Sequence, residues 1–252
     1  FKGVEMAYKF DSDLEFLRQL DSNELNDLVD IIKGKEGDER ITQDLTSNDL
    51  FKRFYPDHKE YIELIMGGEL QCFGGNSFAN VFRGGGVQYK EILCDVCDKL
   101  KVNYSKAQNT QTIEQNMFMK ILSDSLEKMN EEELKQVANE FGLNTTDFKP
   151  QAITAAMQAS ILVSGFAMYK IALIIANTIA KMLLGRGLSL AVNASLVRTI
   201  GAFAGPIGWV ITGLWTLVDV AGPAYRVTIP AVIQVAFLRQ YLINKQNNSE
   251  NN

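Results

Sequence analysis

Charged residues are nearly absent from the second half of this 252-residue chain, and this absence constrains the fold more than any other feature. Between residues 151 and 238 the charged side chains are Lys170, Lys181, Arg186, Arg198, Asp219 and Arg226. Five of these six are basic, whereas the whole chain has a formal net charge of −5. The sequence therefore predicts an acidic soluble helical domain at 1–143, a linker at 144–150, an apolar, net-basic region at 151–242, and a disordered polar tail at 243–252.

Local spacing predicts helices throughout, because no segment alternates apolar and polar residues as a half-buried strand does. Asp21 and Glu24 have the spacing of a helix-capping box. The apolar residues that follow lie on one helical face: Leu25, Leu28, Val29 and Ile32. Glycine clusters at 74–75 and 84–86 indicate joints between helices. We expect an all-α fold in which the acidic N-terminal domain is followed by an apolar C-terminal helical bundle or hairpin.

Two runs without charge, residues 151–169 and 199–218, have the length of membrane spans. A helix of this length reaches roughly 30 Å, about the thickness of the hydrocarbon layer. Glycine and polar residues in both runs offset much of the free energy that apolar residues gain on insertion. Trp209 and Trp215 lie inside the second run, whereas interfacial tryptophans favour the ends of a span. We therefore expect constitutive spanning to be marginal.

Residues 170–181 have a wide apolar face and a thin cationic edge. Lys170, Asn177 and Lys181 lie on one stripe of a helix, and isoleucines occupy the other faces. This pattern suits a helix that lies in the headgroup region of a membrane. It suits equally a nearly buried helix whose lysines extend to water. The membrane hypothesis assigns lipid contact to Lys170, Ile174, Ile175, Lys181, Arg186, Arg198, Trp209 and Trp215.

The segment around the glycine clusters is rich in aromatic side chains of the kind that anchor protein interfaces. The residues that would bind a partner are Phe73, Phe78, Phe82, Arg83 and Tyr89. The alternative to membrane binding is therefore a protein-interaction module. In that case residues 151–242 form a soluble core and this aromatic block forms a binding surface.

Patterns that indicate catalysis or metal binding are weak. His58 is the only histidine and lies among charged residues, which predicts a solvated side chain. Cys94 and Cys97 have neither a second cysteine pair nor a neighbouring histidine, so they cannot complete a four-ligand zinc site. The glycine clusters lack the lysine and hydroxyl residue of a phosphate-binding loop. We expect no enzymatic activity, cofactor or metal, and the acidic N-terminal part opposes binding of nucleic acid.

Three blocks of the sequence are distinctive: residues 11–20 (DSDLEFLRQL), 68–102 (GELQCFGGNSFANVFRGGGVQYKEILCDVCDKLKV) and 222–239 (GPAYRVTIPAVIQVAFLR). These blocks resemble the YaaW family of uncharacterised bacterial proteins. That family is grouped with the ubiquinol–cytochrome c chaperones, which are helical proteins that handle a membrane-protein client. The resemblance implies a helical bacterial protein in the cytoplasm or at the membrane surface, and it supplies no catalytic residues.

Two hypotheses of function follow. In the first, a non-enzymatic protein binds or inserts into a bilayer through residues 151–242. An extension of this hypothesis is that the inserted helices form a pore. In the second, the chain is an interaction or assembly-chaperone module. The expected partners are membrane lipid or a membrane-protein client. The expected location is the cytoplasm, at or in the inner membrane, and an oligomer is compatible with both hypotheses.

Overall fold

A computed structural model describes residues 9–34, 43–71, 87–190, 205–210, 212–213 and 225–250. These ranges contain helices and no strand, which confirms the all-α prediction for the described part of the chain. Residues 205–210 and 212–213 are helical. The other elements are η1 (Glu15–Gln19), α1 (Ser22–Lys33), α2 (Gln43–Ser47), α3 (Asp49–Phe54), η2 (His58–Tyr61), η3 (Leu64–Gln71), α5 (Tyr89–Lys99), α6 (Thr110–Leu126), α7 (Glu131–Glu140), α8 (Pro150–Val163), α9 (Gly165–Leu184) and α11 (Tyr225–Glu250).

Capping side chains set the starts of several helices. The Asp21 side chain accepts a hydrogen bond from the Glu24 amide at 2.9 Å, and the Glu24 side chain accepts one from the Asp21 amide at 2.9 Å. Asn130 and Glu133 form the same reciprocal pair at the start of α7. Each cap contributes about 1 kcal/mol, because it satisfies amides that have no partner inside the helix. The capping box at Asp21 confirms the prediction from sequence spacing.

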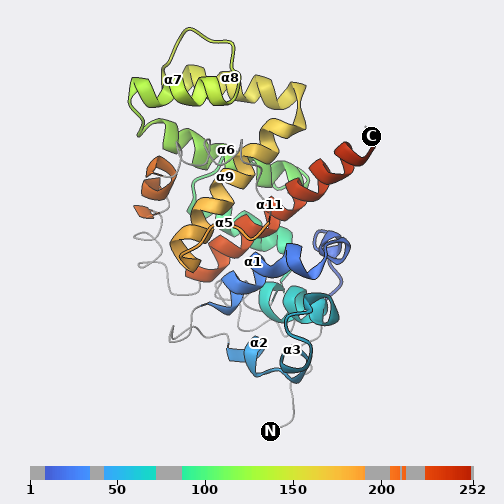
Figure 1. The fold of residues 1–252 in the computed structure, drawn as a ribbon. Helices are drawn as coiled ribbons and strands as arrows, with labels where there is room; N and C mark the ends of the chain where they lie inside the picture. Colours follow the sequence, from blue (N-terminus) through green and yellow to red (C-terminus); the bar gives the residue numbers. More distant parts are fainter. Residues whose placement is uncertain are drawn as a thin grey trace.

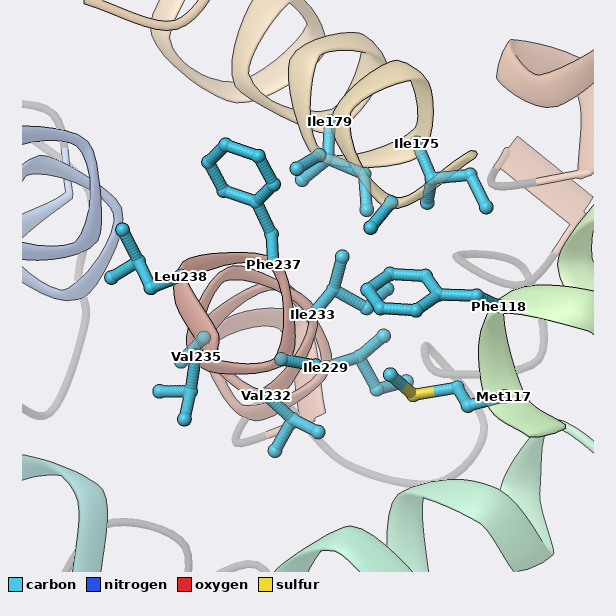
Figure 2. Packing of buried hydrophobic residues seen from close by; sticks show 14 of the residues in the cluster. Met117, Phe118, Ile175, Ile179, Ile229, Val232, Ile233, Val235, Phe237 and Leu238 are labelled. Carbon is cyan, nitrogen blue, oxygen red and sulfur yellow. The ribbon is translucent and has the colours of Figure 1, made fainter. Parts of the chain in front are cut away.

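Helix α11 lies at the centre of the molecule and packs against α9, α1, α5 and α6 (Figure 1). It is buried on every side from Val227 to Leu238, and most of these residues are apolar, as expected of a helix enclosed by other elements. Phe237 points toward α9, whereas Ile229 and Ile233 point toward Phe118 of α6 (Figure 2). The buried part of α11 is therefore the centre of the core.

One hydrophobic core includes residues from both sides of residue 150. Leu28 of α1 and Phe118 of α6 belong to the same buried cluster as Ile175 of α9 and Ile233 of α11. The division into a domain at 1–143 and a region at 151–242 stays a prediction, and helices from both ranges contribute to this cluster. The amphipathic α1 packs its apolar face against α9 and α11.

The charge-free run at 151–169 is not one continuous helix. Helix α8 ends at Val163, and Ser164 is extended and caps the start of α9 by accepting a hydrogen bond from the Phe166 amide. Among the described helices, α9 alone has the length and apolar composition to cross a membrane, and 67% of its 18-residue apolar window is buried. The run therefore does not form the single continuous helix that a span of its length would need, because the Ser164 side chain caps the start of a new helix there.

The predicted disordered tail also differs from the structure, since α11 continues to Glu250. The Lys245 ammonium group lies 2.6 Å from the Glu24 carboxylate, and Gln246 donates a hydrogen bond to Gln19. Tyr241 donates a second hydrogen bond to Glu24 at 2.7 Å. These contacts with the N-terminal segment explain why a polar sequence remains helical here.

Candidate functional site

The residues predicted to contact lipid through α9 lie mainly in the core. Ile174 and Ile175 are buried at 2% and 0% exposure, because this side of α9 packs within the helical core. Lys170 is half-buried, and its ammonium group donates to the Glu140 carbonyl and lies 4.5 Å from the centre of the Phe141 ring. Burial lowers the pKa of Lys170, while Glu140 acts in the opposite direction. The structure thus matches the alternative of a buried helix, and the exposed apolar face predicted here is absent.

Arg186, one of the basic residues assigned to lipid, is paired with two carboxylates of α1. Arg186 binds the Asp27 carboxylate at 2.7 Å and the Asp30 carboxylate at 2.5 Å. Asp27 is fully buried and also accepts two hydrogen bonds from Ser189. Lys181 is exposed to solvent. Arg186 therefore joins the turn after α9 to α1, whereas Lys181 remains at the surface.

The other residues predicted to contact lipid or a partner lie in different parts of the fold or outside the described residues. Trp209 is 76% exposed on the helical residues 205–210, where the neighbouring Ile207 is buried. Tyr89 is 1% exposed and lies in the core, so it does not lie on the surface predicted to bind a partner. Outside the described residues lie Arg198, Trp215, Phe73, Phe78, Phe82 and Arg83.

Tyr89 belongs to a buried polar cluster around Glu114. The Tyr89 hydroxyl donates to one oxygen of the Glu114 carboxylate at 2.8 Å, and Arg239 donates to the other at 2.8 Å. Arg239 also donates to the Asp13 carbonyl at 2.6 Å. Burial raises the pKa of Glu114, against the opposing effect of Arg239 and the two hydrogen bonds. Burial also raises the pKa of Tyr89.

The same cluster extends to the first residues of the described chain. Asp11 accepts a hydrogen bond from the Tyr89 amide at 2.7 Å, at the start of α5. Asp13 accepts one from the Thr110 hydroxyl at 2.7 Å, at the start of α6. The three blocks that carry the family resemblance meet here, through Asp11, Tyr89 and Arg239. Because the residues at its centre are buried and mutually bonded, we interpret the cluster as a structural junction of α5, α6, α11 and the N-terminal segment.

His58 was predicted to be a solvated residue, and that prediction is wrong. His58 is 1% exposed, and its Nε2 lies 2.6 Å from the Asn26 side-chain oxygen. Its Nδ1 is bonded to the Tyr61 hydroxyl. These contacts join η2 to α1, and burial lowers the pKa of the imidazole. No local sequence pattern indicates this burial, since the partner Asn26 lies 32 residues away.

The two described cysteines are also core residues. Cys94 and Cys97 are buried and carry free thiols. Burial raises the pKa of both thiols, so at neutral pH they remain protonated and poorly nucleophilic. They pack as small hydrophobic residues on α5, as their position on the apolar face of that helix predicts.

A different surface stands out in the structure, at the corner where α8 turns into α9. The side chains of Leu162 and Val163 are 89% and 88% exposed, and Phe166 is 49% exposed. Figure 1 shows α8 leading into this corner at one edge of the molecule. The sequence contained the signal for this feature in Ser164 and Gly165, because a capping residue followed by glycine interrupts an apolar helix.

The described part of the chain defines an all-α protein built around the central helix α11. A family model described as "Ubiquinol-cytochrome C chaperone" matches residues 63–234, and a domain of unknown function, DUF3944, matches residues 8–41. A UPF0174 protein of Helicobacter pylori strain J99 is 54% identical over 236 residues, covering 93% of each chain. The UPF0174 protein YaaW of Escherichia coli K12 is 31% identical over 240 residues, covering 94% of this chain and 97% of that protein. The chain belongs to the UPF0174 (YaaW) family. No solved structure matches it.

Proposed function

We propose that this chain is a non-enzymatic interaction protein of the assembly-chaperone type, which binds another protein and uses α9 and α11 as its own soluble core. One observation carries the proposal. Helix α9, the described helix with the length and composition of a membrane span, is mostly enclosed, whereas the charge-free helix α8 has an exposed side. A contiguous patch of exposed apolar side chains on a protein surface typically marks a binding site.

The family model gives this proposal its class of partner. Its description reads "Ubiquinol-cytochrome C chaperone", and the match covers α5 through most of the buried part of α11. We therefore expect the client to be a membrane-protein subunit that has not yet assembled. The clustered titratable groups Glu114, Tyr89 and Arg239 support a non-enzymatic role, because they are bonded to one another inside the core.

Affinity purification tests this function. The tagged full chain would be produced in Escherichia coli that lacks its own YaaW protein, and cells would be cross-linked before purification. We expect one membrane-protein subunit to be enriched over an untagged control, and we expect the complex to form again from the two purified proteins. Recovery of the chain alone, or failure of the purified pair to associate, contradicts the proposal.

Membrane insertion remains the second candidate, and one observation favours it. Helix α9 has the length and composition of a span, and an exposed turn at Ser164 joins it to α8. Insertion requires α9 to leave its extensive contact with α11, which buries apolar residues such as Phe237 and Ile175. Flotation with phosphatidylglycerol vesicles and release of an encapsulated dye test it, and a chain that stays at the bottom of the gradient argues against it.

A further inference from the structure

We propose that the outward side of α8, with the corner formed by Leu162, Val163 and Phe166, docks an uncharged apolar helix of a client protein. This inference rests on the proposed chaperone-type function and names the chemistry of the segment that the protein would bind. We call this surface the α8 face. Its exposed residues on α8 are Gln151, Ala155, Gln158, Ala159, Leu162 and Val163.

The charge of the α8 face determines which partner fits it. No charged residue occurs from 151 to 169, so the face and the corner together present no ionic group. The nearest cation beyond the corner, Lys170, already donates to the Glu140 carbonyl. A charged partner segment would lose water on docking and find no opposite charge, which is costly. The partner segment that complements the face is therefore itself uncharged.

The side chains along the α8 face favour a protein helix over a lipid surface. Helices that lie in a membrane interface carry large apolar residues along one side and lysine or arginine beside them. The α8 face has Ala155, Gln158 and Ala159 along its middle and only Leu162 and Val163 as large aliphatic residues. Alanine positions allow the backbone of a second helix to approach closely, and the large side chains at the corner then act as anchors.

The extent of the face also favours a single helix over a second copy of the chain. A stable protein dimer typically uses about 20–30 residues from each partner. The α8 face and the corner supply far fewer exposed residues. A helix docked on another protein can instead be held by a few anchor side chains at helical spacing. The occupant that matches both the charge and the size of the surface is one apolar helix.

Fluorescence anisotropy with two synthetic peptides tests this inference on the full chain. The first peptide is an uncharged amphipathic helix with leucine on one side and serine and glutamine on the other. The second is identical except that glutamate replaces two of the leucines. We expect the first peptide to bind. The second should bind with an affinity lower by about tenfold or more, because its charges would be desolvated without a partner.

The double variant Leu162→Gln/Val163→Gln should weaken binding of the first peptide by about tenfold or more, since it removes the aliphatic anchors. Leu50→Gln is the matched control, because Leu50 is also an exposed leucine, 48% exposed on α3. We expect the control to bind as the unchanged protein does. Far-ultraviolet circular dichroism verifies that all variants are folded, which the high exposure of these positions favours.

Several outcomes overturn the inference. The first is that neither peptide binds, and the second is that both peptides bind with equal affinity. The third is that the double variant binds the first peptide as tightly as the unchanged protein does. Flotation on phosphatidylcholine vesicles that the double variant abolishes assigns the face to lipid instead. Self-association in sedimentation velocity that the double variant abolishes assigns it to a second copy. If the cross-linked client still purifies with the double variant, the proposed function stands and only this surface assignment fails.

Discussion

The guanidinium group of Arg239 lies 2.8 Å from the carboxylate of Glu114, although 125 residues separate them in the chain. Glu114 is fully buried, and Arg239 also lies 4.2 Å from the centre of the Phe16 ring. The pair joins α11 to α6, and through the Asp13 carbonyl Arg239 also holds the N-terminal segment. A single ion pair therefore connects three parts of the chain that are distant in sequence.

Breaking this pair should destabilise the protein strongly. Glu114→Gln leaves the Arg239 charge buried without its counterion, and we expect a loss of about 3 kcal/mol in the free energy of unfolding. Urea denaturation measures this loss. The double variant Glu114→Gln/Arg239→Met removes the unpaired charge and should be less destabilised than the sum of the two single changes. A loss below about 1 kcal/mol for Glu114→Gln would show that the pair contributes little.

The contacts of Arg186 predict a structural role for a residue that the sequence assigned to lipid. Arg186→Gln leaves Asp27 without its cation, although Ser189 still donates two hydrogen bonds to that carboxylate. We expect a loss of about 2 kcal/mol in unfolding free energy. Lys181→Gln is the matched control, because Lys181 is exposed, and we expect a change within about 0.5 kcal/mol. Equal effects of the two substitutions would contradict this assignment.

The buried imidazole of His58 predicts a dependence of stability on pH. Burial lowers the pKa of His58 in the folded protein below its value of about 6.5 in the unfolded chain. The unfolded state therefore binds the proton more tightly, so the contribution of His58 is complete above pH of about 6.5 and is lost as the pH falls below it. Asp30 and Asp57 oppose the lowering of this pKa, and Lys33 adds to it.

Comparison with His58→Gln isolates this contribution, because the other titrating groups are common to both proteins. The unchanged protein should exceed the variant in unfolding free energy by more at pH of about 7.5 than at pH of about 5.5. Urea denaturation at the two pH values provides the measurement. A difference that is constant or that grows toward acid would exclude a neutral, buried His58.

Gln234 offers a stabilising substitution. Its side chain is 1% exposed, and neither of its polar side-chain atoms has a hydrogen-bond partner in the part of the chain that the structure describes. A buried amide without partners costs about 1–3 kcal/mol. Gln234→Met keeps a similar shape without the polar atoms, and we expect it to raise the unfolding free energy by about 1 kcal/mol.

Thr178→Val provides the contrast to Gln234→Met. The Thr178 hydroxyl donates to the Ile174 carbonyl at 2.9 Å, so its removal should not stabilise the protein. Thermal denaturation of the two variants gives the order of stability. A lower melting temperature for Gln234→Met would mean that the amide is satisfied in solution.

Local structure could be predicted from this sequence more completely than long-range packing. The capping box at Asp21 depends on residues three apart, and it was predicted correctly. The burial of Tyr89 and His58 depends on Glu114 and Asn26, which lie 25 and 32 residues away, and no local pattern contains that information. The all-α class can be predicted from the helical periodicity of the apolar residues. The burial of each polar residue depends instead on which helices pack against one another.

The charge-free half of the chain illustrates the same limit. Its composition fits a membrane, a partner or a protein core equally well, because each of these surroundings removes apolar surface from water. The choice between them depends on whether α1, α5 and α6 can cover α9 and α11, which they do. The exposed corner at Leu162 was missed because the interruption at Ser164 is small compared with the long apolar run around it.

The central position of α11 has a consequence for synthesis of the protein on the ribosome. Helix α11 is translated after α1 and α5, which pack against it, so those early helices emerge before the surface that they must cover exists. Their apolar faces cannot pack on α11 until that helix has left the ribosome. Folding of this chain is therefore a late and collective event, and a prematurely terminated product would lack the element that holds the others together.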